Sequence, residues 1–190
     1  MKLTPKEFLD ILHFTERLKD TPRHCTTSGR RTESVAEHSW RVSLMAFFLK
    51  HEFADLDINR VMEMCLIHDL GECFTGDIPT FSKTDNDRIN EDALLSEWVS
   101  SLPVVLSSEL SDLYDEMNAQ KTKEARLFKA LDKLEALIQH NESPLDTWSE
   151  NEFDLNKKYA FDTVEFSQWM TDLRNEILSE TLDKIENESK

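Results

Sequence analysis

Glycine and proline, the residues that most often interrupt helices, are scarce in this chain, at 3 and 5 of 190 residues. Leucine, glutamate, lysine and alanine instead fill long stretches in which hydrophobic residues recur at helical spacing. The sequence therefore predicts an all-α protein. Its length suits one domain over residues 1–190 with a sizeable core, and no linker, internal repeat or low-complexity segment divides it.

Membrane and secretion signals are also missing from the sequence. No hydrophobic run approaches the roughly 20 residues that a membrane-spanning helix needs, and the first residues do not follow the signal-peptide pattern. The three cysteines, Cys25, Cys65 and Cys73, are an odd number and do not form a disulfide framework. We interpret them as reduced thiols, which indicates a cytoplasmic protein.

Basic residues are too few for a protein that binds nucleic-acid polymers. Lysine and arginine number 22 against 38 aspartates and glutamates, which gives a formal net charge of -16. A protein that binds a phosphate backbone needs a basic surface. The simplest interpretation of this acidity is a solvated surface that keeps the protein soluble. A small phosphorylated substrate remains compatible, because a metal ion and a few local cations set the field inside a pocket.

Capping signals and hydrophobic periodicity predict where the helices lie. Thr4 with Glu7 and Ser34 with Glu37 form capping boxes that open two helices, and Asp57 can cap a third. Beyond the helix that starts at Thr4, helices are predicted over residues 34–50, 58–70, 87–101, 107–118, 121–141 and about 163–186. Residues 20–33 and 71–85 are predicted loops, the first of them ordered, with Gly71 as a helix stop, and 141–160 is a variable polar stretch.

Four polar residues on three predicted helices fall at or beside core-facing positions: His38, His68, Asp69 and Asp132. His38, for example, precedes Val42 by four residues on the same hydrophobic face. Buried carboxylates without partners are costly, so helices that aim such groups inward are expected to share a cation. Two imidazoles and two carboxylates suit one divalent Mn, Co, Fe, Ni or Zn ion better than Mg or Ca. The alternative is a buried salt-bridge network with arginines.

Glu72 is the candidate for proton transfer, because it follows His68 by one helical turn. A metal ion at this site would lower the pKa of a bound water from about 15.7 towards about 7 and so supply a hydroxide nucleophile. A carboxylate in the same pocket can take a proton from water or return one to the leaving oxygen. The alternative is a solvated glutamate beyond a helix end.

The loop before His38 offers three arginines, Arg23, Arg30 and Arg31, whose planar guanidinium groups bind phosphate oxygens in pairs. Arg31 has the further possibility of a structural ion pair with a nearby carboxylate such as Glu37. Asp77, in a Gly-Asp-Ile-Pro turn, can accept a hydrogen bond from its own turn or from a sugar hydroxyl. The remaining histidines, His13, His51 and His140, have no evident partners in the sequence.

The order of His38, His68-Asp69 and Asp132 is that of the HD-domain metal-dependent phosphohydrolases. Four segments carry the resemblance: RTESVAEHS at 31–39, IHDLGE at 67–72, TGDIP at 75–79 and ALDKL at 130–134. The spacing of the metal motif alone specifies only the superfamily, whereas the first and third segments are more specific. On these segments the chain resembles the 5'-deoxynucleotidase branch over roughly residues 5–140, with a helical extension over about 160–187.

This resemblance implies a compact HD-domain helical bundle with the metal site among its core helices. It implies hydrolysis of 5'-phosphomonoesters of deoxynucleosides by a metal-activated water, and pairing as a homodimer. No histidine lies between His68 and Asp132, whereas a di-iron site in this kind of fold would need some there, so one metal is expected. The implied metal ligands are His38, His68, Asp69 and Asp132.

The resemblance also assigns the remaining site residues. The implied catalytic residues are Glu72 as general acid or base, Asp69 as a metal ligand and Arg23, which orients the phosphate. The implied substrate-binding residues are Arg23, His24, Asp77, Ile78, Pro79 and Thr80. The bacterial enzyme of this branch carries a tryptophan, near the sugar, at the position of His24, so His24 bears on selectivity between deoxyribose and ribose.

Two other functions fit the same residues. One is a different HD phosphohydrolase that acts on nucleoside triphosphates, cyclic nucleotides or guanosine tetraphosphate. The last of these usually has an HD-x-x-E-D arrangement, whereas Leu70-Gly71-Glu72-Cys73 follows the central pair here, and the chain is small for a triphosphohydrolase. The other is a catalytically silent, metal-stabilised module that binds a nucleotide or a protein.

Overall fold

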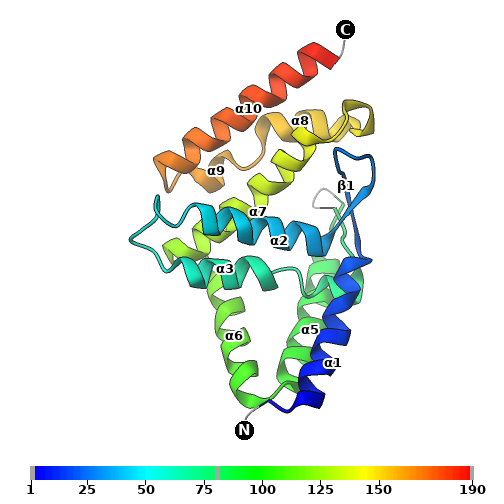
Figure 1. The fold of residues 1–190 in the computed structure, drawn as a ribbon, viewed down its shortest axis with the longest axis vertical. Helices are drawn as coiled ribbons and strands as arrows, with labels where there is room; N and C mark the ends of the chain where they lie inside the picture. Colours follow the sequence, from blue (N-terminus) through cyan, green and yellow to red (C-terminus); the bar gives the residue numbers. More distant parts are fainter. Residues whose placement is uncertain (1–2, 80–81, 189–190) are drawn as a thin grey trace.

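The computed structural model describes residues 3–79 and 82–188, and it confirms the predicted all-α fold (Figure 1). The helices are α1 (Pro5–Thr15), α2 (Val35–Phe48), α3 (Ile58–Ile67), α4 (Glu72–Thr75), α5 (Asp85–Ser101), α6 (Val104–Ala119), α7 (Lys123–Glu142), α8 (Glu150–Lys158), α9 (Phe161–Val164) and α10 (Gln168–Glu188). Short 3-10 helices cover Glu16–Lys19 (η1) and Leu145–Thr147 (η2), and two strands, β1 (Pro22–Thr26) and β2 (Thr32–Ser34), pair antiparallel.

Helices α2, α3 and α7 form the centre of the molecule. They pack against one another, and the surfaces at which they meet supply core side chains such as Val42, Val61, Met64 and Leu131, all fully buried. Figure 1 shows α1, α5 and α6 extending from this centre toward one end and α8, α9 and α10 covering the other. Because α7 packs against both α3 and α10, residues far apart in the sequence share one hydrophobic core.

The predicted helix starts are confirmed by their capping hydrogen bonds. The hydroxyl oxygens of Thr4 and Ser34 accept hydrogen bonds from the backbone of Glu7 and Glu37, and both glutamates complete the reciprocal capping box. Asp57 caps α3 by accepting from the backbone N–H of Arg60. These local signals depend on residues three positions apart, which is why the sequence alone reveals them.

The prediction of an ordered loop over residues 20–33 missed regular structure, because this segment contains β1 and begins β2. Some of the turn-forming residues lie in the connection between the strands, where Arg30 has a positive φ of 64°, whereas Asp20 precedes β1 and Pro22 begins it. Both strands are short, and β1 has only one fully buried residue, Cys25. So short a strand shows no clear alternation of hydrophobic and polar residues, and the hairpin is therefore difficult to detect from the sequence.

Gly71 does not act as a helix stop. Helix α3 ends at Ile67, a turn follows, and α4 then forms inside the predicted 71–85 loop. Gly71 has right-handed backbone angles (φ -58°), and a Cβ atom there would lie 2.9 Å from the Cγ atom of Glu91. The glycine thus permits close approach to α5. The left-handed residue that ends α4 is Gly76, with φ 74°.

The C-terminal region also differs from the prediction. The polar stretch over residues 141–160 contains η2 and α8, and the single helix predicted from about 163 is divided into α9 and α10. Ser149 and Glu152 form a capping box that starts α8. Polar composition hid this helix, whose buried residues are Glu152 and Asn156 rather than a hydrophobic stripe.

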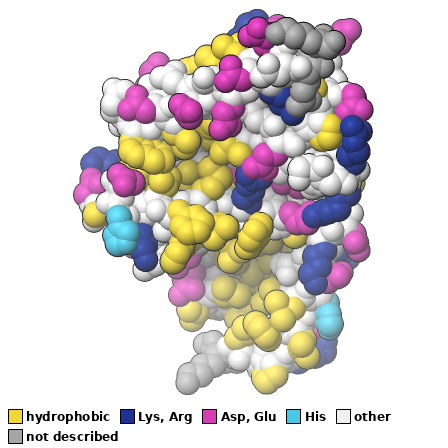
Figure 2. Space-filling view, turned by 45° about the horizontal axis from the view of Figure 1, so that its top comes forward, with side chains coloured by type: hydrophobic (Ala, Val, Ile, Leu, Met, Phe, Trp, Pro, Cys, Tyr) yellow, Lys and Arg dark blue, Asp and Glu magenta, His cyan; other side chains and the backbone are white. Residues whose placement is uncertain are grey.

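The described surface carries large exposed hydrophobic side chains as well as charge. Figure 2 shows one face on which hydrophobic side chains gather across the middle and lower part, while acidic side chains lie toward the upper edge. Strongly exposed examples in the molecule are Phe48, Leu66 and Val105. Within the described residues, none of the helices has the length and apolar content that crossing a membrane requires.

Candidate metal centre

Helices α2, α3 and α7 bring the four predicted metal ligands together. The capping box at Ser34 places His38 as the fourth residue of α2, while His68 and Asp69 follow the end of α3. Asp132 lies in the middle of α7. These three helices pack against one another at the centre of the fold. The site therefore lies in the most buried part of the molecule.

The ligand atoms converge on one point. The Nε2 atom of His68 lies 3.3 Å from Nε2 of His38, 3.1 Å from Oδ2 of Asp69 and 3.5 Å from Oδ1 of Asp132. The Nε2 atom of His38 is 3.2 Å from Asp132 and 3.9 Å from Asp69. Ligand atoms held about 2.0–2.2 Å from one ion stand roughly 3–4 Å apart. The ligand atoms of His38, His68 and Asp69 all lie within 4.8 Å of one another, and Asp132 lies beside both imidazoles, so the cluster could hold a divalent cation.

Both imidazoles are oriented by a hydrogen bond at the opposite ring nitrogen. Nδ1 of His68 donates to the backbone carbonyl of Cys65 at 2.8 Å, and Nδ1 of His38 lies against the fully buried carboxylate of Glu135. These partners leave the two Nε2 atoms directed at the cluster, as metal-binding histidines require. Asp132 is positioned similarly, because its second oxygen accepts from Lys129 at 2.7 Å.

The electrostatics of the cluster also favour a cation. Burial disfavours the charged form of His68, but the charge of Asp69 and hydrogen bonding to Asp132 outweigh it and raise the His68 pKa to about 10. Burial likewise opposes ionisation of Asp69, yet the charge of His68 lowers its pKa to about 2. A negative potential that retains protons on imidazoles also attracts a divalent ion, which replaces those protons.

Glu72, the predicted proton-transfer residue, is buried in the first turn of α4, with 6% of its surface exposed. Its Oε2 atom has no hydrogen-bond partner within the described part of the chain. Burial and the charges of Asp69 and Asp77 raise its pKa to about 9. A buried, unpaired carboxyl group beside a metal cluster can hold or transfer a proton. A divalent ion next to Asp69 would lower the Glu72 pKa, because positive charge favours the ionised carboxylate.

Of the three arginines in the loop before His38, Arg23 lies at the metal cluster. Its Nη1 atom is 3.9 Å from Oδ2 of Asp69, and its Nε atom is 3.1 Å from Glu33. The other two are held elsewhere: Arg30 forms a bidentate pair with Asp146, and Arg31 pairs with Glu37, one N–O distance being 2.7 Å. The structural role considered for Arg31 is thus observed.

The remaining predicted substrate residues are less closely grouped. Asp77 is near enough to Glu72 for its charge to raise the Glu72 pKa, and Ile78 and Pro79 follow it as half-buried residues. His24 instead lies 3.3 Å from Glu152, on the side of α8. Thr80 lies outside the described residues.

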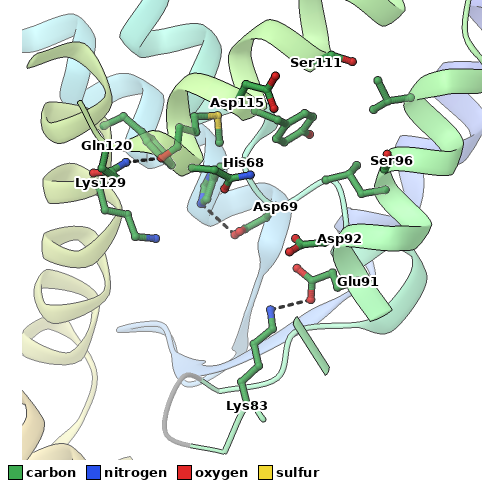
Figure 3. A pocket seen from close by; sticks show the side chains of 16 residues that line it. His68, Asp69, Lys83, Glu91, Asp92, Ser96, Ser111, Asp115, Gln120 and Lys129 are labelled. Carbon is green, nitrogen blue, oxygen red and sulfur yellow. Dashed lines mark hydrogen bonds and ion pairs between the residues drawn. The ribbon is translucent and has the colours of Figure 1, made fainter. Parts of the chain in front are cut away.

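A cavity of about 570 Å³ opens beside the metal cluster (Figure 3). His68 and Asp69 form part of its wall, and side chains of α5, α6 and α7 form most of the rest. Lys83 lies at its edge, in an ion pair with Glu91 at 2.6 Å. The Asp69 side chain is 19% exposed, so the cluster is accessible to a small molecule. The size suits a ligand such as a nucleotide.

Several residues of the site were missed from the sequence. Lys83, Glu91 and Lys129 come from segments that the predicted metal motif does not include. Glu135 had a detectable signal, because it follows Asp132 by three residues and therefore lies on the same face of α7. His140, for which the sequence suggested no partner, is buried and contacts Cys25, Asn156 and Glu152; that prediction was wrong.

Glu135 provides a test of how the centre is built. The Glu135→Gln protein is expected to bind metal about 10- to 100-fold more weakly, because His38 loses the negative charge behind its ring. Competition against a chelating dye measures this affinity. Glu142→Gln is the matched control: Glu142 is on the same helix and pairs with Arg41, but it is exposed and does not contact His38. Equal affinities of the two variants would contradict a supporting role for Glu135.

The fold and the site thus define a class of protein. It is all-α, and its three central helices bring together a buried cluster of two histidines and two aspartates. The family model for the HD domain matches residues 15–174. The chain belongs to the HD-domain family.

Individual relatives agree with this assignment. The chain is 32% identical over 142 residues to the human protein 5'-deoxynucleotidase HDDC2, covering 72% of this chain and 68% of the relative. It is 34% identical over 141 residues to the protein of the same name from Danio rerio, covering 70% and 68%. A crystal structure from Magnetospirillum magnetotacticum, described as a predicted metal-dependent phosphohydrolase, is 26% identical with a TM-score of 0.79 and covers 94% of this chain and 95% of that one.

Proposed function

We propose that this HD-domain protein is a metal-dependent phosphohydrolase that removes phosphate from deoxynucleoside 5'-monophosphates. The observation that carries the proposal is the convergence of His38, His68, Asp69 and Asp132 beside a cavity. The buried Glu72 adds to it, because its charge interaction with Asp69 places it near the cluster and its Oε2 atom has no hydrogen-bond partner among the described residues. The names of the human and zebrafish relatives, both 5'-deoxynucleotidases, support this substrate class. The description of the Magnetospirillum structure supports metal dependence.

The four ligands would together hold one divalent transition metal ion. Their nitrogen and oxygen donors suit Mn, Co, Fe, Ni or Zn. Such an ion, when bound, polarises a phosphate oxygen and makes water more acidic. His38 and His68 supply neutral nitrogen donors fixed by Glu135 and by the Cys65 carbonyl. Asp69 and Asp132 supply negative charge that balances the ion.

Glu72 and Arg23 act on the substrate and on the water. With a raised pKa, Glu72 can hold a proton and deliver it to the 5'-oxygen as the bond to phosphorus breaks. Arg23 lies within 3.9 Å of Asp69, so its guanidinium group is placed to bind oxygens of a phosphate at the cluster. Hydrolysis then depends on positioning the phosphate and the attacking water and on neutralising the negative charge of the phosphate, as phosphoryl transfer generally does.

Sugar recognition is assigned to the turn after α4. Asp77 is proposed to accept a hydrogen bond from the sugar 3'-hydroxyl, with Ile78 and Pro79 beside the nucleoside. His24 is proposed to influence selectivity for deoxyribose indirectly. It follows Arg23 in β1, and its contact with Glu152 helps to fix the strand that carries the phosphate-binding arginine.

A substrate panel tests the proposed function. Metal-stripped protein, refilled separately with Mn, Co, Zn or Mg, is assayed for phosphate release from deoxy and ribo 5'-monophosphates, 3'-monophosphates, triphosphates and cyclic nucleotides. We expect metal-dependent release from 5'-monophosphates, faster for the deoxy series. Turnover confined to triphosphates or cyclic nucleotides would assign the chain to another class of HD phosphohydrolase. No turnover in the whole panel would favour a nucleotide-binding module.

Further parts of the proposal concern organisation and location. We propose one HD domain over the chain, because Val42 of α2 and Ile177 of α10 belong to the same buried core. We propose a homodimer, supported by the resemblance and by exposed hydrophobic side chains such as Leu66 and Val105. The free, buried thiols of Cys25, Cys65 and Cys73 support a reducing compartment such as the cytoplasm.

A further inference from the structure

A second cluster of metal-binding side chains lies outside the centre described above. Its members are His24 and Cys25 of β1, His140 of α7 and Glu152 of α8. One ligand atom from each of His24, Cys25 and His140 lies within 4.8 Å of the others. The Nε2 atom of His140 is 3.3 Å from the Cys25 sulfur and 3.4 Å from Oε1 of Glu152. The Nε2 atom of His24 is 3.3 Å from the same Glu152 oxygen and 4.0 Å from the sulfur.

The orientation of His140 is fixed from behind by Asn156. The Asn156 amide nitrogen donates to the carbonyl of Leu137 and to the side-chain oxygen of Asn141, which identifies the other amide atom as the oxygen. That oxygen accepts a hydrogen bond of 2.7 Å from Nδ1 of His140. The Nε2 atom is therefore directed into the cluster, as in a metal-binding histidine whose outer nitrogen donates to a buried acceptor.

Glu152 is fixed as firmly as His140. Its Oε2 atom accepts from the backbone N–H of Ser149 in the capping box of α8, which directs Oε1 at the two imidazoles. A carboxylate oxygen and the unprotonated nitrogen of His140 thus face each other, and both are acceptors. Only a positive charge between them, a metal ion or an extra proton on the ring, makes this buried contact favourable.

The separations measured from the two imidazole nitrogens match those of a tetrahedral metal site, and the ligand atoms of His24, Cys25 and His140 all lie within 4.8 Å of one another. Ligands at zinc distances of about 2.0–2.3 Å stand roughly 3.3–3.6 Å apart, and three of the four measured separations are 3.3–3.4 Å. A thiolate and a carboxylate together balance the charge of one divalent ion in this buried position. We propose that His24, Cys25, His140 and Glu152 form a second site, for Zn²⁺ or a divalent ion of similar preference.

The burial of the cluster indicates a structural ion rather than a reacting group. Cys25 is 1% exposed and His140 2%, so the thiol is not accessible to a substrate. His24 retains 24% of its side-chain exposure and provides the route by which an ion enters. Sites with four protein ligands and no open position are typical of structural zinc.

The second ion would join three elements that are distant in the sequence. It connects β1 to α7 and α8, and β1 also carries Arg23, whose guanidinium group lies at the first metal centre. The strand is short; it pairs with β2, and its Thr26 carbonyl accepts hydrogen bonds from Gln139 and Ser143 of the α7 region. Because His24 and Cys25 directly follow Arg23 in β1, an ion at this position would help to hold the phosphate-binding arginine in place.

Cobalt substitution tests the second site separately from the first. The first centre has only nitrogen and oxygen ligands, so a near-ultraviolet thiolate-to-cobalt charge-transfer band reports on Cys25 alone. We expect the metal-stripped protein to bind two Co²⁺ ions and to show this band. Cys25→Ser should bind one Co²⁺ and lose the band. His68→Ala should also bind one Co²⁺ but keep it, which distinguishes failure of this proposal from failure of the proposed function.

Two further variants complete the experiment. Cys73→Ala is the matched control, because Cys73 is also a buried free thiol, and it should keep two ions and the band. If Cys25→Ser does not fold, His24→Gln changes the most exposed ligand and should weaken the binding of the second ion at least tenfold, with unchanged helical circular dichroism. The proposal is overturned if the unmodified protein binds one Co²⁺ without the band, or if His24→Gln binds two ions with unchanged affinity. Protonated His140, whose pKa its partners raise to about 9 despite burial, would then supply the positive charge.

Discussion

The Glu72→Gln protein is expected to keep its metal but to release phosphate about 10²- to 10⁴-fold more slowly, which is the usual contribution of a positioned general acid or base. Glutamine has nearly the same shape, so the packing of α4 should be preserved. What is lost is the ability of this buried side chain to carry a proton. Phosphate release under saturating substrate measures the loss, and metal analysis of the same sample verifies occupancy.

The pH dependence of turnover provides a second measurement on the same variant. A general acid works only while protonated, so the rate should fall as the pH rises through the Glu72 pKa. That pKa is raised to about 9 by burial and by Asp69 and Asp77, and a bound divalent ion shifts it downward. We therefore expect an alkaline decline at or below about pH 9 that is missing from Glu72→Gln. Glu63→Gln, an exposed position on α3, is the control and should retain both rate and profile. An unchanged rate in Glu72→Gln would remove Glu72 from the mechanism.

Removal of the His68 side chain should affect metal binding as well as turnover. His68→Ala is expected to lose the metal of the first centre, because the Nε2 atom of His68 is within 3.1–3.5 Å of all three other ligand groups. Turnover should fall by more than about 10²-fold, the upper range for loss of a residue that only supports a ligand. The variant should also unfold at a lower temperature and lose the stabilisation that the added metal gives to the unmodified protein.

His51→Ala is the control for that experiment. His51 lies just beyond the end of α2 and is exposed, so its removal should leave metal content, turnover and thermal stability unchanged. Metal content is measured by elemental analysis after dialysis, and stability by thermal denaturation with and without a chelator. Stoichiometric metal in His68→Ala, together with normal turnover, would show that the cluster is not the catalytic metal site.

The helices could be predicted where their signals are local. The capping boxes at Thr4 and Ser34 and the cap at Asp57 were recognisable because each involves residues three positions apart. The strands β1 and β2 were not, because their pairing depends on partners across a turn and neither has a clear alternating pattern. Gly71 was misinterpreted for a related reason. Its importance comes from the approach of Glu91, which no local pattern contains.

The same distinction applies to the candidate site. His38, His68, Asp69 and Asp132 could be found because polar residues on hydrophobic helix faces are unusual. Glu135 completes the set from the same face of α7 and could have been included. The contacts of His140 with Cys25, Asn156 and Glu152 join three separate segments, one of them a helix without a hydrophobic stripe. Only the tertiary structure brings such residues together.

The order of the ligands along the chain has a consequence for biosynthesis. His38 and Asp132 are 94 residues apart, and Cys25 and His140 are 115 apart. Because a ribosome delivers the N-terminal segment first, α2 and α3 emerge with three of the four ligands of the first centre long before α7. The first cluster is not complete until α7 has been synthesised, and the second needs Glu152 of α8 as well. Metal capture is therefore a late event in the maturation of this protein, and it adds its binding energy only to chains that have acquired their central helix.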